Sequence, residues 1–488
     1  MKQPIAIDIL AHADFSGRLR HSRHNLGYAA FGTAVETLRR QNPAGTVLLD
    51  AGDAFSTNFW GGAPCVDAVS LLGTDAMTLG NHEFDRGQAF LNDCIRRADF
   101  PILCANIVEK ATGDRISGTK PFVLLERAGV RIGVVGITTE YTPYMVTASS
   151  FLPYAAQSAV EACRSAIPAV RAAGADIVVL LAHVPFYIEE DGSATGELVD
   201  ILSGIPPVDV CIGGHIPGDY AGRIGDTIVL KGGFGGGSLC HAHLLVDPDT
   251  HRIVDRAGRV VLNGAIDEPL PAYRDYEERV TGPFQSFFED VLATTDEAWS
   301  IRLSAETRLG NFLAGCVQEA AGTDAAYLNA TSAGGSIRPG PVTAEDITSV
   351  MGFNDPILKA RITGAQLYRL FELVYVPERF GNNAGLMHAG LVVYADHTKP
   401  AFSKIQRITL PDGTPLDPAR EYTVATSEYM ASGGNDTSEV AGALDWHETG
   451  VRMYDALFAS IRRHGGLYVA PGQRLHETGR PENDNSPF

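Results

Sequence analysis

The chain has 488 residues, of which 45% are hydrophobic and 20% charged, and its formal net charge is −19. These values are typical of a globular protein with two or three domains. The acidic balance argues against nucleic acid and membrane surfaces as partners, because both need a basic face. Neither a membrane-spanning apolar run nor a secretory signal is visible. Seven scattered cysteines, none in a Cys-x-x-Cys pair, indicate reduced thiols and a cytoplasmic protein, or a periplasmic one if a leader has been removed.

Two apolar stretches near the N-terminus lead into carboxylates. The first, over residues 5–13, predicts a strand that ends at Asp14. A predicted helix over 28–40 follows, and then a second predicted strand over 46–50 leads to Asp53. A carboxylate beside a glycine at a strand end is well placed to present a ligand at a sheet edge. An Asx turn is the alternative interpretation of Asp14 taken singly.

The stretch over residues 80–85 reads Gly-Asn-His-Glu-Phe-Asp and follows a short apolar run over 74–79. The amide oxygen of Asn81 can bind a cation. The ring of His82, the next residue, points elsewhere and can reach a substrate oxygen. Asp85 lies three residues further on and can set the tautomer of that ring. This grouping suits the polarisation and protonation of a leaving group, and a polar turn before the next helix is the alternative.

The following segments alternate between predicted helices and predicted strands, with helices over 87–98 and 159–173 and strands over 101–106, 130–137, 177–181 and 208–212. The last two strands lead directly to His183 and His215. A lone histidine is usually structural, but two histidines that each follow a buried strand indicate a site. Five strand ends thus carry oxygen or nitrogen ligands that suit Mn, Fe, Zn or Co better than Ca: Asp14, Asp53, Asn81, His183 and His215.

In this order the residues resemble the 5′-nucleotidase family, which joins a calcineurin-like metallophosphoesterase domain to a C-terminal nucleotidase domain. Asp14 is similar to the aspartate of the family's Asp-x-His motif, and Asp53 to its bridging aspartate. Residues 80–85 match the family's Gly-Asn-His-Glu-Phe-Asp motif letter for letter, and the two histidines match the later ligands. The resemblance implies metal ligation by these residues and a catalytic His82 assisted by Asp85. It also implies an α/β fold, with a four-layer αββα sandwich and a second, α+β domain.

The second half carries further similarities, at residues 309–314, 329–338, 352–355 and 432–435. For the glycine-containing stretches, simple turn geometry is the alternative. Arg338 places a guanidinium in a glycine loop, where it is suited to hold a phosphate or a carboxylate. One of the family's two base-stacking rings is expected at Tyr429; the other falls near Gly385, where Phe380 is the nearest replacement. The resemblance implies substrate-binding roles for Arg338, Phe353, Asn354, Tyr429 and Asn435.

Two departures from the family pattern fall on the same metal position. Ser16 stands where the family has a histidine ligand, and Pro217 stands where it has a histidine or glutamine. A proline side chain has no donor atom. His12, on the strand before Asp14, is the first candidate to replace a lost ligand; His21 and His24 are weaker candidates. The resemblance therefore implies one well-retained divalent ion (Mn, Zn, Co or Fe) and an incomplete second position.

The expected function is that of a metal-dependent phosphomonoesterase, acting on a nucleotide or related small phosphate ester through metal-activated water with help from His82 and Asp85. A sugar phosphate substrate, or a catalytically impaired ligand-binding protein on the same fold, are the alternatives. The expected domains are a metallophosphoesterase domain over 1–265, a linker helix within 266–299, and a substrate domain over 300–488. A long polar pattern over 270–299 predicts the helix. The oligomeric state is not indicated.

Overall fold

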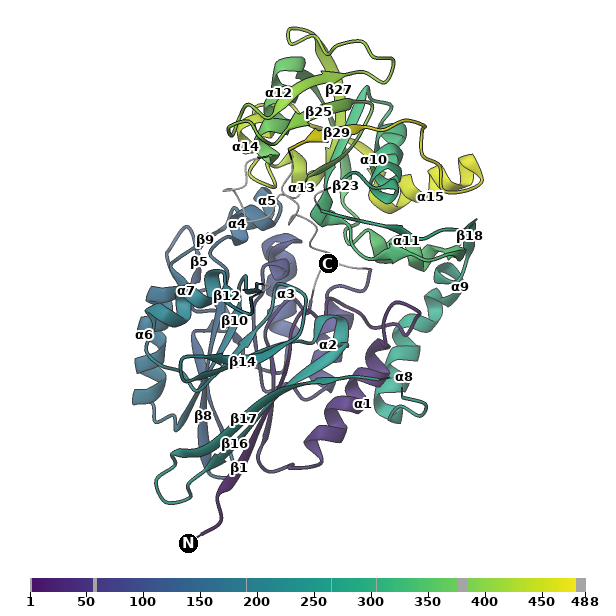
Figure 1. Ribbon diagram of the computed structural model, residues 1–488. Helices are drawn as coiled ribbons and strands as arrows, with labels where there is room; N and C mark the ends of the chain where they lie inside the picture. Colours follow the sequence, from purple (N-terminus) through teal and green to yellow (C-terminus); the bar gives the residue numbers. More distant parts are fainter. Residues whose placement is uncertain are drawn as a thin grey trace. The chain divides into compact units, whose positions relative to one another are not determined.

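The computed structural model describes residues 2–55, 59–189, 191–264, 266–303, 305–375 and 385–479 (Figure 1). The chain divides into two compact units, Met1–Pro283 and Phe284–Phe488. Each unit is built around its own sheets and has its own buried apolar clusters. The α/β fold class expected from the alternating pattern is confirmed.

The first unit contains two mixed β-sheets. The seven-stranded sheet has the order β17-β16-β1-β2-β3-β4-β6, with bounds Ile253–Leu262, Ser238–Val246, Ile5–His12, Thr46–Asp50, Ala76–Thr78, Ile102–Leu103 and Thr119–Lys120. The six-stranded sheet has the order β14-β15-β13-β10-β8-β7, with bounds Tyr220–Ile224, Thr227–Lys231, Val210–Gly213, Ile177–His183, Val130–Thr138 and Phe122–Arg127. Two small antiparallel two-stranded sheets complete the first unit: β5 (Ile107–Glu109) with β9 (Tyr154–Ala156), and β11 (Tyr187–Ile188) with β12 (Ala194–Thr195).

The two large sheets pack face to face and helices cover their outer faces. Ile9 of β1 and Val179 of β10 belong to one fully buried cluster between the sheets. The next residue on β10, Leu180, points to the opposite face and packs in a second cluster with Ile167 and Leu198, as the alternation of strand side chains requires. Those two residues lie on α6 (Ala159–Ala172) and α7 (Glu197–Gly204), while α1 (Gly27–Arg39) and α8 (Pro271–Thr281) lie on the other side (Figure 1).

The remaining helices of the first unit lie between its strands along the chain. They are α2 (Ala63–Leu71), the 3₁₀ turn η1 (His82–Phe84), α3 (Gly87–Arg97), α4 (Thr142–Met145), α5 (Ala148–Phe151) and the 3₁₀ turn η2 (Phe234–Gly236). Strands β1, β2 and β3 are parallel neighbours, as are β10 and β13. Because parallel strands end at the same edge of a sheet, their following residues are gathered there.

The expectation of one helix over 270–299 is wrong. Helix α8 ends at Thr281, and the short elements η3 (Gly282–Phe284) and α9 (Gln285–Phe288) follow. Pro283 cannot donate the backbone hydrogen bond that a continuing helix needs. The β-branched run that comes next forms strand β18 (Val291–Thr295). Helix α8 is part of the first unit, where the Glu277 carboxylate accepts backbone hydrogen bonds from His21 and Ala29 at 2.6 and 2.7 Å.

The second unit is centred on a five-stranded sheet with the order β24-β20-β27-β23-β28, with bounds Leu386–Ala389, Ala325–Asn329, Glu421–Ser427, Pro356–Thr363 and His447–Arg452. Helices α10 (Arg308–Ala321), α11 (Ala344–Val350) and α15 (Met453–His464) contribute to the buried cluster on one face. Helix α12 (Gly364–Val374) and the three-stranded sheet of β26 (Ile405–Thr409), β25 (Val392–Asp396) and β29 (Leu475–Thr478) contribute to the cluster on the other.

The remaining elements of the second unit are short. Strand β18 pairs with β22 (Gly340–Thr343), and β19 (Trp299–Ser300) pairs with β21 (Ser336–Ile337). The 3₁₀ turn η4 (Ala330–Ser332) and helices α13 (Glu428–Ala431) and α14 (Ser438–Ala441) lie in its loops. Among the described residues of both units, none of the helices has the length and apolar content needed to cross a bilayer.

Candidate active site

The structure brings together the five strand-end side chains of the first unit. Asn81 Oδ1 lies 2.8 Å from Nδ1 of His215. His183 Nε2 lies 3.0 Å from Oδ2 of Asp53 and 3.9 Å from Oδ1 of Asp14. These contacts join residues that follow β1, β2 and β3 in one sheet to residues that follow β10 and β13 in the other. The site therefore exists only because the two sheets pack with their strand ends on the same side.

Within this group, Asp53, His183 and His215 offer ligand atoms that all lie within 4.8 Å of one another. The carboxylate of Asp14 is turned differently: its two oxygens accept the backbone N–H of His215 at 3.2 and 3.0 Å. Burial raises the pKa of Asp14 to about 6, even though the neighbouring His183 acts in the opposite direction. Asp14 therefore fixes the loop that carries the candidate ligand His215, and it also lies near the cluster.

The chemistry of His183 fits a bound cation. Its ring is completely buried, and Nδ1 lies 2.7 Å from the carbonyl oxygen of Ala51. A carbonyl can only accept, so Nδ1 carries a proton and Nε2 is the atom that can coordinate. Nε2 makes no hydrogen bond with any described residue, although the Asp53 carboxylate lies 3.0 Å away. Burial opposes the charged ring, yet the carboxylates of Asp53 and Asp14 raise the pKa of His183 to about 9. A divalent cation would balance the negative charge of the same two carboxylates.

Three residues of the site have left-handed backbone conformations: φ is 54° at Asp14, 59° at Asp53 and 75° at His215. Non-glycine residues rarely adopt this region, and they do so mainly where the surrounding structure enforces it at a functional site. The strand therefore does not continue through these positions, and each side chain is redirected at the point where the pleat ends.

Hydrogen bonds to Glu83 hold the loop of Asp53 and the loop of Asn81 in place. Its carboxylate is fully buried and accepts four backbone hydrogen bonds, from Asp53, Ala54, Phe55 and Gly80, at 2.9, 2.8, 2.9 and 2.7 Å. Burial raises the pKa of Glu83 to about 7, and the Asp53 carboxylate acts in the same direction. Sequence reasoning did not single out Glu83, although its place in the Gly-Asn-His-Glu-Phe-Asp stretch was the available signal.

His82 is joined to the cluster through its own backbone. Its N–H donates to Oδ1 of Asp53 at 2.9 Å, and its ring Nδ1 lies 2.9 Å from Oδ2 of Asp85. Burial disfavours the charged ring, but the carboxylates of Asp85 and Asp53 outweigh it and raise the pKa of His82 to about 10. Without a bound cation, the ring is therefore an imidazolium at neutral pH and has a proton to give.

The two departures from the family pattern have clear positions. Ser16 lies at φ 48°, and its backbone N–H donates to the carbonyl oxygen of Asp53 at 2.9 Å. Pro217 is exposed, and its carbonyl oxygen lies 3.5 Å from Nζ of Lys231. The group of three candidate ligands consists of Asp53, His183 and His215, and neither Ser16 nor Pro217 supplies one of its ligand atoms.

His12 does not replace the missing ligand. Its ring is completely buried with its centroid 5.1 Å from that of Phe31 on α1, and its Nε2 lies 3.8 Å from Oδ2 of Asp50. It therefore faces the helix side of the sheet. The backbone N–H of His21 donates to Glu277, and its Nδ1 lies 3.0 Å from the carbonyl oxygen of Leu26. Neither His21 nor His24 belongs to a metal-binding group in the described part of the chain.

The residues expected to bind substrate lie in the second unit and take several structural roles. Arg338 is exposed just after β21. The side chain of Asn354 accepts the backbone N–H of Tyr454 at 2.9 Å and so holds the first turn of α15. Tyr429 and Asn435 pair with each other: the tyrosine hydroxyl lies 3.0 Å from the Asn435 amide oxygen and accepts its backbone N–H at 3.1 Å. Phe353 is half-buried before Asn354, and Phe380 lies outside the described residues.

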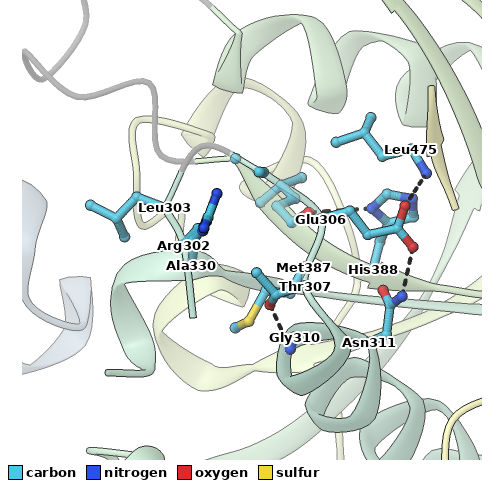
Figure 2. A pocket seen from close by; sticks show the side chains of 13 residues that line it. Arg302, Leu303, Glu306, Thr307, Gly310, Asn311, Ala330, Met387, His388 and Leu475 are labelled. Carbon is cyan, nitrogen blue, oxygen red and sulfur yellow. Dashed lines mark hydrogen bonds between the residues drawn. The ribbon is translucent and has the colours of Figure 1, made fainter. Parts of the chain in front are cut away.

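The second unit, where the resemblance implies the leaving-group pocket, contains a pocket lined by other residues than those expected to bind substrate (Figure 2). Polar groups that line the pocket are already hydrogen-bonded to each other. The Glu306 carboxylate accepts hydrogen bonds from the Asn311 side chain at 2.6 Å and from the Leu475 backbone at 2.9 Å. None of the five expected substrate residues lines it. The lining residues are Arg302, Leu303, Ala305, Glu306, Thr307, Gly310, Asn311, Ala330, Gly385, Leu386, Met387, His388 and Leu475.

Comparison with known proteins agrees with this arrangement. Residues 21–219 match the calcineurin-like phosphoesterase family, and residues 291–441 match the 5′-nucleotidase C-terminal domain. The chain is 24% identical to protein UshA of Yersinia enterocolitica, over 94% of this chain and 92% of that protein. It is also 24% identical to the 5′-nucleotidase of Rattus norvegicus, over 92% of this chain and 84% of that protein.

Solved structures share the fold. A 5′-nucleotidase precursor from Thermus thermophilus superposes with a TM-score of 0.82 at 20% identity, covering 98% of this chain and all of that one. The sulfate thiohydrolase SoxB of the same species superposes with a TM-score of 0.76 at 18% identity, covering 98% of each chain. The fold and site thus define a metallophosphoesterase with a nucleotidase-type second domain. The chain belongs to the 5′-nucleotidase family and is a hydrolase of that family.

Proposed function

We propose that the protein is a divalent-metal-dependent phosphomonoesterase that acts on a nucleotide or a related small phosphate ester. The family relationship supports the reaction class, and relatives named 5′-nucleotidase support the substrate class. The observation that carries the proposal is the attachment of His82 to Asp53 at 2.9 Å, with Asp85 at 2.9 Å on the ring. A proton donor is therefore held at a fixed position beside the candidate cation ligands.

In this proposal Asp53, Asn81, His183 and His215 hold the cation. Calcineurin-like phosphoesterases bind divalent metals, and the mixed carboxylate, amide and imidazole donors suit Mn, Zn, Co or Fe. When bound, a divalent cation supplies positive charge against the phosphoryl oxygens and makes water a stronger acid. Asp14 orients the backbone of His215, and Glu83 holds the loops of Asp53 and Asn81 against each other.

The chain's own acid is His82. Asp85 keeps the Nδ1 proton in place, so the opposite ring nitrogen, Nε2, is the one that faces proton transfer. The imidazolium gives its Nε2 proton to the ester oxygen as that oxygen leaves, and Asp85 keeps the ring oriented throughout. A positioned general acid contributes about 10²–10⁴-fold to a rate.

The test is phosphate release by untagged full-length protein, stripped with a chelator and reloaded with Mn²⁺, Co²⁺, Zn²⁺ or Mg²⁺. Nucleotides and sugar phosphates form the substrate panel. We expect turnover that requires a cation, and a loss of about 10²–10⁴-fold in kcat for His82→Ala with unchanged metal content. His251→Ala, which removes a half-buried histidine paired with Asp176 elsewhere in the same unit, is the control and should keep full activity. No turnover on any substrate with any metal would reject the proposal.

Two observations favour a second candidate, a phosphatase for a non-nucleotide ester that works with a single cation. Ser16 and Pro217 stand where the family has the two ligands of the second metal position, and the hydroxyl of Tyr429, the expected base-stacking ring, is bonded to Asn435. A loss of about one bound metal ion per chain on His183→Ala/His215→Ala substitution, with sugar phosphates preferred over nucleotides by the wild type, would favour this candidate. Tight binding of a phosphate ester without turnover, unaffected by His82→Ala, would instead indicate a binding protein.

A further inference from the structure

A second cluster of metal-binding side chains lies on the seven-stranded sheet of the first unit, away from the candidate active site. It consists of Asp8 on β1 and of His241 and His243 on β16. The two histidines are two residues apart on one strand, so they share a face. The antiparallel register places Asp8 directly opposite His243. Asp8 is four residues before His12, so about 13 Å of strand separates it from the strand end that leads to Asp14.

The three candidate ligand atoms lie close together. Oδ1 of Asp8 lies 2.7 Å from Nε2 of His241 and 2.8 Å from Nδ1 of His243. Its other oxygen accepts a hydrogen bond from the Asn42 side chain at 2.8 Å, which fixes the plane of the carboxylate. Asp8 and His241 are each 8% exposed, whereas the His243 side chain is 46% exposed. The cluster is therefore preorganised on its inner side and open to solvent on its outer side.

In the absence of a metal, the contact with Arg259 selects the tautomer of the neutral His241 ring. Its Nη2 lies 3.1 Å from Nδ1 of His241. A guanidinium can only donate, so Nδ1 accepts and the proton of the neutral ring sits on Nε2, facing Asp8. A cation on Nε2 needs that proton to move to Nδ1, which requires Arg259 to turn away. Arg259 is exposed on the edge strand β17 and has room to do so.

We propose that Asp8, His241 and His243 form a second site, separate from the candidate active site, for Zn²⁺ or a similar borderline divalent cation. Two imidazoles and one carboxylate are a common zinc ligand set, with water at the open position. Each neutral ring moves its proton from the coordinating nitrogen to the other nitrogen, so binding releases no net proton. The second oxygen of Asp8 keeps its bond to Asn42. The bound ion would tie the first half of β1 to β16.

The experiment separates this site from the proposed catalytic one by removing the latter. Untagged full-length His183→Ala/His215→Ala protein is equilibrated with Zn²⁺, freed of excess ion, and its zinc measured by mass spectrometry. We expect about one zinc per chain. Adding His243→Ala should reduce this to the background level. Adding His251→Ala, the matched control at a His–Asp pair that belongs to no described cluster, should leave it unchanged.

Arg259→Ala gives an independent readout in the same background. Removal of the nearby positive charge, and of the donor on His241, should tighten zinc binding about tenfold in a calorimetric titration. Co²⁺ should give the visible absorption of a four-coordinate site, absent after His243→Ala. Circular dichroism of each metal-free variant checks that it is folded, and substitution of the half-exposed His243 leaves the core intact.

The proposal is overturned if the His183→Ala/His215→Ala protein binds no zinc, or if its zinc content stays the same after His243→Ala. It is also overturned if His251→Ala removes as much zinc as His243→Ala does, or if Arg259→Ala leaves the zinc affinity unchanged or weaker. Zinc retained at this cluster by a protein that hydrolyses no phosphate ester would leave this inference standing while the proposed function fails, so the two outcomes are distinguishable.

Discussion

Nδ1 of His82 and Oδ2 of Asp85 lie 2.9 Å apart across the single 3₁₀ turn η1, and the carboxylate fixes both the ring plane and its charge. The turn spans His82–Phe84 and α3 begins at Gly87, so the pair lies on a short segment directly before a helix. The same segment donates the His82 backbone N–H to Asp53. The orientation of the His82 ring and the position of the candidate ligand Asp53 are therefore coupled through one stretch of backbone.

Replacement of Asp85 by Asn should lower the pKa of His82 from about 10 towards its ordinary value near 6.5. The physical reason is the loss of the negative charge that stabilises the imidazolium. Histidine-labelled, metal-free protein titrated by NMR would show the change, and the His82→Ala spectrum would assign the signal. An unchanged titration midpoint in Asp85→Asn would mean that another carboxylate controls the ring.

Glu83→Gln should destabilise the first unit and weaken metal binding together. The carboxylate accepts four backbone N–H groups, whereas an amide can accept at only one of its two ends and places its NH₂ against two donors. We expect a loss of about 2–4 kcal/mol in the free energy of unfolding, measured in urea, and a lower metal-to-chain ratio after dialysis. Glu161→Gln, on the exposed face of α6, is the control and should change neither. Loss of stability with full metal content would contradict the link to Asp53.

The contribution of Asp8 to stability should depend on pH. Burial raises the pKa of this carboxyl, but hydrogen bonds from His241, His243 and Asn42 outweigh it and hold the pKa well below its ordinary value. The folded state therefore binds its proton more weakly than the unfolded state. The stabilisation is complete above the unfolded pKa of about 3.9 and is lost as the pH falls below it.

Asp8→Asn should accordingly cost about 2 kcal/mol at pH 7, and the difference from the wild type should shrink progressively below pH ~4. Urea unfolding in the presence of a chelator, at several pH values, measures this without a metal contribution. Asp226→Asn, at a side chain that is 98% exposed, should show no such trend. A constant difference between pH 3 and pH 7 would show that the charge of Asp8 is not its source.

Gly434→Ala should disturb the pairing of Tyr429 and Asn435 in the second unit. A Cβ at Gly434 would lie 2.5 Å from the tyrosine ring, so the ring or the loop must move. We expect a loss of about 1–3 kcal/mol in the stability of this unit and a higher KM if the pair borders the substrate. Gly466→Ala has no atom within 4 Å of the added Cβ and should be close to neutral. Equal effects of the two substitutions would refute the steric argument.

Local spacing explains what could be predicted. Asn81, His82 and Asp85 fall within one turn, so their proximity follows from the sequence whatever the rest of the chain does. The strand ends were also accessible, because apolar runs such as Val210–Gly213 stop at polar residues. His12 shows where this reasoning fails: the alternation of a strand relates it to Asp14 only if the strand continues, but Asp14 lies beyond the strand with φ 54°.

By itself, then, the sequence determined the ligand types, their order, and the pairing of His82 with Asp85, because each depends on composition or on separations of a few residues. Only the tertiary structure decided that His183 Nε2 meets Asp53 across two sheets, and that Asp8 meets His241, 233 residues later, on neighbouring strands. Such contacts depend on sheet order and register, which arise from the burial of the whole apolar face and not from any local pattern.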